Sequence, residues 1–282
     1  PSGCEAVLPG GVPEHWARTA QRHAAEAARR QARSRLGVLE SPADLAIEFA
    51  YDPLMCSSEL RSLALQVCIS YSETLKSAAS RAQRRQPPEV LPQDLVRMAL
   101  VGASGAALRA LQRMQDFPSW PIAQAESLSS AMTGAAIHSS VVILSPDATE
   151  PLLHIQPKTT YVIGGLVDSH RGRQSHASLG YATERDIQAR RLPIDEYSDE
   201  IGGHVCYKVL TVNQAFCIVM DAILMARDAA DTDFEASLGV VPDWGGLFRT
   251  WLPPRTRLAA SQRGLREAGA AAGDAEQPRR KK

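Results

Sequence analysis

The amino-acid sequence predicts an α/β fold, in which a parallel sheet is covered by helices on both faces. Two observations support this prediction. In the second half of the chain, short runs of β-forming apolar residues alternate with stretches of helical periodicity. The apolar runs end at sharp turns that carry polar residues, at Ser145, at Gly164-Gly165 and at Leu192-Pro193. Such turns are expected at the carboxyl ends of parallel strands, where open α/β folds bind ligands.

The first half of the chain is predicted to contain a helix at 14–36, a strand at 44–52 and a second helix at 59–78. The first helix has strong helical propensity but almost no apolar face, so we expect it to face solvent or RNA. A basic, proline-containing break follows at 80–92. The type of element at 95–114 stays open, and the Ala/Ser-rich residues 121–139 are only weakly determined.

The second half is predicted to contain strands at 141–144, 161–167 and 189–194 and helices at 175–188 and 213–228. In the last of these helices, Phe216, Val219, Met220 and Ile223 recur with helical spacing and are expected to face inward. Strands that alternate with helices indicate a parallel sheet.

Positive charge gathers at the ends of the chain, although the whole chain carries 31 basic and 31 acidic residues. The first predicted helix contains Arg18, Arg22, Arg29, Arg30, Arg33 and Arg35. The chain ends in Arg-Arg-Lys-Lys. Basic ends on a neutral middle are typical of a nucleic-acid binder with basic arms. A solvated helix and a disordered tail would have the same composition, and both interpretations stay open.

Cysteine and histidine are not spaced like metal ligands. The five cysteines are odd in number, widely spaced and without a Cys-x-x-Cys pair, which indicates reduced thiols in an intracellular compartment. The seven histidines offer no ligand spacing either, so no metal is expected. No apolar stretch reaches the roughly 18 residues of a membrane span, and no secretory segment begins the chain. We expect a nuclear or cytoplasmic protein, with mitochondria left open.

Three segments carry a family resemblance. They read Gly-Gly-Leu-Val-Asp at 164–168, Arg-Leu-Pro-Ile-Asp-Glu-Tyr at 191–197 and Lys-Val-Leu-Thr-Val-Asn-Gln at 208–214. In this order and spacing they strongly resemble the tRNA purine-9 N1-methyltransferase family of the SPOUT superclass. The sequence Tyr-Asp-Pro-Leu-Met at 51–55 is similar to that family's amino-terminal signature. The resemblance covers residues 44–242.

The resemblance implies a SPOUT-type domain at 44–252 with a trefoil knot at its carboxyl-terminal end. A basic helical arm at 14–43 would precede it, and residues 1–13 and the basic tail 253–282 are expected to be disordered. The resemblance also implies S-adenosylmethionine as cofactor, tRNA as partner and a monomer without metal or membrane. The implied reaction is methylation of N1 of the purine at position 9 of tRNA, with guanine expected first. A SPOUT enzyme for adenine-9 or another RNA position, and a non-catalytic RNA-binding subunit, are the alternatives.

Asp168 is the expected catalytic residue. Guanine N1 carries a proton and is a poor nucleophile until that proton leaves, so a carboxylate within hydrogen-bond reach would serve as general base. The resemblance implies this role for the aspartate after Gly-Gly-Leu-Val. Asp168 has two alternative roles, capping the following turn or orienting the base or a water molecule without taking the proton.

The cofactor is expected to lie against the turns that end the strands. Because glycine has no Cβ, Gly164 and Gly165 would let a ligand approach the backbone. The other turns would supply apolar walls and backbone polar groups. The expected cofactor-binding residues are Leu144, Gly164, Gly165, Val167, Leu192, Pro193, Val209, Leu210, Thr211 and Asn213. The expected RNA-binding residues are Arg171, Arg173, Arg190 and Lys208, whose cationic groups suit phosphates.

Several polar residues in the same turns have a structural as well as a functional interpretation. Asp195 and Glu196 resemble a catalytic acid pair, but a turn of this sequence more often holds its own loop. Asn213 and Gln214 begin a predicted helix, where capping competes with a contact to the cofactor. His170 is expected at the surface.

Overall fold

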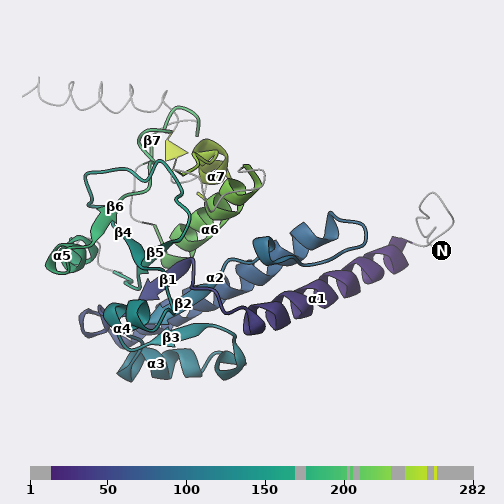
Figure 1. Ribbon diagram of the computed structural model, residues 1–282, viewed down its shortest axis with the longest axis horizontal. Coiled ribbons are helices and arrows are strands. Elements are labelled where there is room, and N and C mark those ends of the chain that lie inside the picture. Colours follow the sequence, from purple (N-terminus) through teal and green to yellow (C-terminus); the bar gives the residue numbers. More distant parts are fainter. Residues whose placement is uncertain are drawn as a thin grey trace, which may run out of the picture.

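The sheet at the centre of the protein contains six strands in the order β3-β2-β1-β5-β4-β6 (Figure 1). Every neighbouring pair is parallel, as the sequence predicts. The strands are β1 Leu45–Glu48, β2 Met98–Val101, β3 Ala123–Ala125, β4 Ser140–Leu144, β5 Thr159–Gly164 and β6 Gln188–Arg190. The computed structural model describes residues 14–168, 176–201, 204–205, 210–229, 239–252 and 257–258.

Helices cover both faces of the sheet. The longer helices are α1 Glu14–Val38, α2 Ser57–Gln83, α3 Gly105–Gln112, α4 Leu128–Thr133, α5 Ala177–Glu184, α6 Val212–Ala229 and α7 Trp244–Trp251. Leu45 and Ile47 of β1 face a core shared with α2, α3 and α6. Ala46 faces the opposite core, which α4 and α5 cover. Because β1 is buried on both sides, its sequence is a continuous apolar run until Glu48.

Short elements complete the described part of the chain. The 3₁₀ turns are η1 Asp52–Leu54, η2 Pro92–Asp94 and η3 Phe117–Ser119. Two further strands, β7 His204–Val205 and β8 Arg257–Leu258, pair antiparallel outside the main sheet. Within the described residues, no helix combines the length and apolar character needed to cross a membrane.

Most of the predicted elements are confirmed, but several end earlier than predicted; the strand expected at 44–52 is only Leu45–Glu48. The strand expected at 161–167 stops at Gly164, because its partner β1 ends at the paired residue Glu48. The strand expected at 189–194 is only Gln188–Arg190, and Pro193 has no N–H to extend a ladder. The helix expected at 175–188 ends at Glu184, shortly before Asp186 takes a left-handed conformation.

The segments left open by the sequence each contain a strand and a helix. Residues 95–114 form β2 and α3, and residues 121–139 form β3 and α4. The basic break predicted from residue 80 begins slightly later, since α2 continues to Gln83. In each case tertiary packing decides the boundary, which local propensity leaves undetermined.

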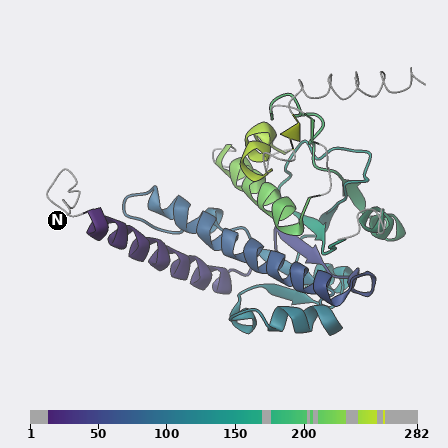
Figure 2. The ribbon, with the colours of Figure 1, turned by 180° about the vertical axis from the view of Figure 1, so that it is seen from behind.

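The sequence predicts that helix α1 faces solvent or RNA along its whole length. In the structure, part of the helix is buried instead. Ala32 and Leu36 are buried in a small core with Ala78 and Ala82 of α2. Figures 1 and 2 show α1 lying alongside α2 in both views, with its amino-terminal end extending past the sheet. The prediction is therefore correct for the first half of α1 and wrong for the second. Alanines carry only a methyl group, so a stripe of them looks weakly apolar yet allows two helices to pack closely.

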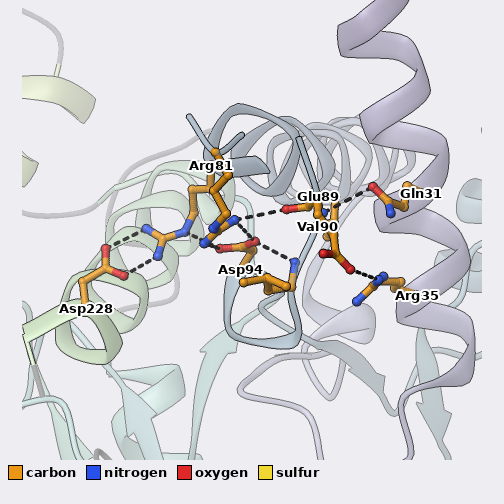
Figure 3. Close-up of polar contacts among 9 residues, drawn as sticks. Gln31, Arg35, Arg81, Glu89, Val90, Asp94 and Asp228 are labelled. Carbon is orange, nitrogen blue, oxygen red and sulfur yellow. Dashed lines mark hydrogen bonds and ion pairs between the residues drawn. The ribbon is translucent and has the colours of Figure 1, made fainter. Parts of the chain in front are cut away.

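A network of charged residues joins α2, η2 and α6 (Figure 3). Arg81 donates to Asp94 Oδ1 at 3.1 Å and forms a two-point ion pair with Asp228 in α6. Arg85 donates to both oxygens of Asp94, at 2.6 and 2.8 Å. Burial alone would raise the pKa of Asp94, but hydrogen bonds from Arg85, the Leu91 N–H and Arg81 outweigh it and hold this pKa below its ordinary value.

Candidate active site

The carboxyl ends of four strands meet at one edge of the sheet. Glu48 of β1 is paired with Gly164 of β5, and Leu144 of β4 is paired with Arg190 of β6. The chain stays in register just beyond these ends, because the Ser145 N–H donates to the Arg190 carbonyl at 2.9 Å. The turns that the sequence singled out therefore leave the sheet side by side, as predicted.

The two glycines at this edge are tightly enclosed by protein atoms. A Cβ on Gly165 would lie 2.8 Å from the carbonyl oxygen of Glu48 and 3.1 Å from Ile47 Cγ2. A Cβ on Gly164 would lie 3.2 Å from the ring of Tyr51. Glycine is therefore required at 165 for packing against β1 and at 164 for packing against Tyr51, whether or not a ligand binds there. The sequence did not reveal this reason. Close approach of a ligand stays a prediction.

Half-buried apolar side chains occur in each of the predicted cofactor segments. Leu166, Val167, Leu192 and Leu210 each pack against the main core while part of their surface stays accessible. The other described residues of the predicted cofactor set differ in exposure. Leu144 and Pro193 are buried, Asn213 is half-buried and Thr211 is exposed. These segments offer partly accessible apolar surface, which suits a ligand with a flat apolar part.

Asp168 is half-buried and follows directly on the apolar pair Leu166 and Val167. The chain before it is held against the end of β1 and the turn that follows. The Gly165 N–H donates to the Glu48 carbonyl at 2.7 Å, and the Val167 N–H points to Met55 Sδ at 3.3 Å. The structure therefore places Asp168 at the sheet edge where the predicted cofactor turns meet.

Glu48 is a residue of this edge that sequence reasoning missed. Its side chain is only 2% exposed, and its carboxylate accepts hydrogen bonds from the Tyr181 hydroxyl at 2.7 Å and the Ala50 N–H at 2.9 Å. Burial raises the pKa of Glu48, and these hydrogen bonds only partly oppose that change. A signal was present, since an acidic residue interrupts the otherwise apolar run from Leu45 to Phe49.

Two residues with competing interpretations have structural partners. Glu196 receives a two-point ion pair from Arg191, at 2.8 and 2.6 Å, which closes its own loop. This pair holds the pKa of Glu196 below its ordinary value. Gln214 accepts hydrogen bonds from the N–H and hydroxyl of Thr211, at 3.1 and 2.9 Å, at the start of α6. These bonds support the loop-holding interpretation of Glu196 and the capping interpretation of Gln214, and contact of Asn213 with the cofactor stays a prediction.

The candidate RNA-binding residues are arranged in two groups. Arg190, beside the sheet edge, donates to Glu150 at 3.0 Å and keeps part of its guanidinium accessible. On α1, the side chains of Arg18, Arg22, Arg29 and Arg30 are exposed. Arg33 and Arg35 are engaged within the protein, with Ser119 and Glu89 respectively. Residues 18–30 of α1 thus carry a row of exposed positive charge.

A sequence profile of the family described as tRNA (guanine(9)-N(1))-methyltransferase TRM10/TRM10A matches residues 13–242. The chain belongs to this family.

Two curated relatives of the TRM10/TRM10A family illustrate the extent of the similarity. The tRNA (guanine(9)-N1)-methyltransferase of Eremothecium gossypii is 30% identical over 199 residues, which cover 69% of this chain and 58% of that protein. The tRNA methyltransferase 10 homolog B of Danio rerio is 35% identical over 109 residues, which cover 37% of this chain and 33% of that protein. The chain therefore spans between a third and three fifths of the length of these relatives.

A solved structure of a TRM10 protein has the same fold. The crystal structure of full-length spTrm10 in complex with SAH matches with a TM-score of 0.51 at 23% identity, and the match covers 76% of this chain and 96% of that one. The resemblance seen in the three sequence segments is confirmed by the family match and by this fold.

Some residues expected from the TRM10/TRM10A resemblance lie outside the described part of the chain. They are His170, Arg171, Arg173, Lys208 and Val209, together with residues 1–13 and most of the tail 253–282. In the described part, no group of three or more His, Cys, Asp or Glu side chains is placed to hold a metal ion. The described cysteines Cys56, Cys68 and Cys217 are free thiols.

Proposed function

We propose that the protein is a methyltransferase that uses S-adenosylmethionine to methylate N1 of guanine at position 9 of tRNA. One observation carries the proposal: in a chain of the TRM10/TRM10A family, the turns that follow β4, β5 and β6 leave one sheet edge side by side, and Asp168 lies in the segment that follows β5. Curated relatives of this chain bear the name of that activity.

The residues at this edge fit such a cofactor. The half-buried side chains of Leu166, Leu192 and Leu210 would contact an adenosine group, and backbone N–H and C=O groups in the same turns would bind the adenine edge. The bound cofactor would supply an electrophilic methyl group.

Asp168 would accept the N1 proton of guanine as the methyl group is transferred. Its half-buried position keeps the carboxylate at the protein surface, within reach of a base placed against the sheet edge. A general base of this kind contributes roughly 10²–10⁴-fold to a rate. Adenine N1 carries no proton, so the same aspartate would matter much less for an adenine substrate.

The finer architecture forms part of the same proposal. We infer a trefoil knot at the carboxyl-terminal end, supported by β4 lying between β5 and β6, with β6 reached only after α5. We further infer a monomer whose exposed arginines on α1, with Arg190 at the sheet edge, contact the tRNA backbone.

The test is to incubate the protein with S-adenosylmethionine and tRNA transcripts carrying guanine or adenine at position 9, and to map modified nucleosides by mass spectrometry. We expect 1-methylguanosine at position 9 of the guanine transcript. Methylation of only the adenine transcript, or of another position, would replace the proposed substrate. Cofactor binding without transfer to any tRNA would favour a non-catalytic RNA-binding subunit.

A further inference from the structure

The described chain is anchored on both sides of residues 169–175, which follow Asp168; residues 165–168 are called the entry and residues 176–181 the exit. At the entry, the Gly165 N–H donates to the backbone carbonyl of Glu48 at 2.7 Å. At the exit, Tyr181 of α5 donates its hydroxyl to Glu48 Oε2 at 2.7 Å. A single residue of β1 therefore bonds to both sides of the segment, through its main chain on one side and its side chain on the other.

Other hydrogen bonds hold only one side each. Met55 Sδ lies 3.3 Å from the Val167 N–H at the entry. Ser145 bonds to the Ser178 hydroxyl at 2.9 Å, and Asp147 accepts from the His176 N–H at 2.9 Å, both at the exit. Among the hydrogen bonds of the described residues named here, those of Glu48 reach both the entry and the exit.

The surroundings of Glu48 hold its carboxyl group in one orientation. Oε1 accepts from the Ala50 N–H at 2.9 Å while Oε2 accepts from Tyr181, so both oxygens have a partner. The guanidinium carbon of Arg185 lies 3.7 Å from the centre of the Tyr181 ring and holds that ring from its other side. A buried carboxyl group in an apolar strand is costly, which argues that it has a specific role.

We propose that Glu48 is a positioning residue for Asp168, acting through Gly165 and Tyr181 without touching the substrate. This inference rests on the proposed function, because Asp168 is the reacting group there. By fixing the start of α5 relative to the end of β5, Glu48 holds the carboxylate of Asp168 at a defined distance from the turns that would bind the cofactor. Small displacements of a reacting group cost large factors in rate.

The first test uses hydrogen exchange on the protein without cofactor or tRNA. The variants are Glu48→Ala, Glu48→Gln and Tyr181→Phe, with Tyr71→Phe as matched control, because the Tyr71 hydroxyl is buried without a partner among the described residues. Losing the Glu48–Tyr181 bond should speed exchange about tenfold at the amides of Gly165, Val167 and Gly180. Tyr71→Phe should leave these amides unchanged.

Glu48→Gln separates positioning from chemistry. Its amide can accept from the Ala50 N–H and donate to the Tyr181 oxygen, so exchange should stay within about threefold of the wild-type rate. Unchanged exchange in both Glu48→Ala and Tyr181→Phe would overturn the proposal. Tyr181→Phe removes one hydroxyl and keeps the ring, so it remains informative if Glu48→Ala does not fold.

The second test measures single-turnover methyl transfer at saturating cofactor and tRNA. Tyr181→Phe should lower the rate about tenfold with little change in KM, and Glu48→Gln should recover most of the rate lost in Glu48→Ala. In an Asp168→Asn background, Tyr181→Phe should have almost no further effect, since both act through one group. A rate in Glu48→Gln as low as in Glu48→Ala, with normal exchange, would overturn positioning in favour of direct chemistry. No transfer by the wild type would refute the proposed function alone, and the exchange result would stand.

Discussion

Arg85 and Asp94 share two hydrogen bonds, at 2.6 and 2.8 Å, in which both carboxylate oxygens of Asp94 take part. The side chain of Asp94 is 0% exposed, whereas that of Asp228, the other carboxylate bound by Arg81, is 55% exposed. Asp94 and Asp228 thus bind the same arginine, Arg81, but differ in burial, so substituting each in turn tests the effect of burial on an ion pair.

Asp94→Asn should lower the free energy of unfolding by about 3 kcal/mol, because it breaks a buried pair, removes the carboxylate partner of Arg85 and leaves Arg81 paired only with the exposed Asp228. Asp228→Asn should cost about 1 kcal/mol or less, since an exposed ion pair is screened by solvent. Equilibrium denaturation in urea measures both. Equal losses for the two variants would show that burial of Asp94 does not decide its contribution.

The stability of wild type and Glu48→Gln should diverge with pH. Burial raises the pKa of Glu48 above its ordinary value of 4.5, so the folded protein binds this proton more tightly than the unfolded chain. The contribution of protonated Glu48 to the free energy of unfolding is fully present below pH 4.5. It is lost as the pH rises through the pKa of Glu48 in the folded protein, with a slope of at most about 1.4 kcal/mol per pH unit. Glutamine does not titrate, so the variant should gain stability relative to wild type as pH rises above 4.5. Parallel stability curves between pH 4 and 7 would contradict this.

Gly165→Ala should destabilise the protein by about 2 kcal/mol, the usual cost of overpacking, because its Cβ would meet the backbone of Glu48. Gly180→Ala is the matched control. A Cβ at this position in α5 meets no atom within 4 Å, and alanine is the better helix former, so the change should add up to about 1 kcal/mol. Thermal unfolding of the cofactor-free proteins measures both. If Gly165→Ala were as stable as wild type but failed to bind cofactor, the glycine would serve the ligand and not the packing.

Asp168→Asn should lower methylation of guanine-9 tRNA by roughly 10²–10⁴-fold while cofactor and tRNA still bind. The loss should deepen as pH falls below the pKa of guanine N1, because the base then keeps its proton unless an acceptor is present. Single-turnover rates against pH for both proteins measure this. Parallel profiles less than about tenfold apart would show that Asp168 orients the base and that solvent takes the proton.

Replacing Arg18, Arg22, Arg29 and Arg30 with glutamine should weaken binding to every tRNA alike. These side chains are exposed along α1, and none of them belongs to the core that packs α1 against α2, so the change leaves that contact intact. Each lost phosphate contact should reduce the slope of log K against log salt by roughly 0.7–0.9. Arg35→Gln, at an arginine already paired with Glu89, is the control and should change the slope little. Loss of binding to some tRNAs at constant slope would mean that the arm reads shape or sequence.

The sequence predicts best where periodicity and burial agree. The buried strands β1 and β4 and the amphipathic helices α2 and α6 are confirmed, because their apolar patterns are long enough to be unambiguous. Strand β3 and helix α4 were not predictable, since Ala123–Ala125 and Leu128–Thr133 are short, rich in small residues and set by their neighbours.

The candidate site could be predicted in outline only. Gly164, Gly165 and Leu192 lie at the sheet edge as expected, because turns after parallel strands must gather there. Glu48 could be noticed as an acidic residue in an apolar run, but its role could not be predicted, because its partner Tyr181 lies far away in the sequence and only the fold brings the two together. The close packing at Gly165 likewise depends on β1, a neighbour in space that lies far away in sequence.

The alanine stripe of α1 determines more than the packing of one helix. Ala28 and Ala32 are buried, and Ala32 lies in the core shared with α2. A larger side chain at either position would push α1 outward or rotate it about its axis. The exposed arginines of α1 that lie amino-terminal to its contact with α2 would then be displaced, and Arg18, the farthest from the contact, would be displaced most. The position of the exposed arginines relative to the candidate site therefore depends on the buried methyl groups of Ala28 and Ala32, which no nucleic acid would contact.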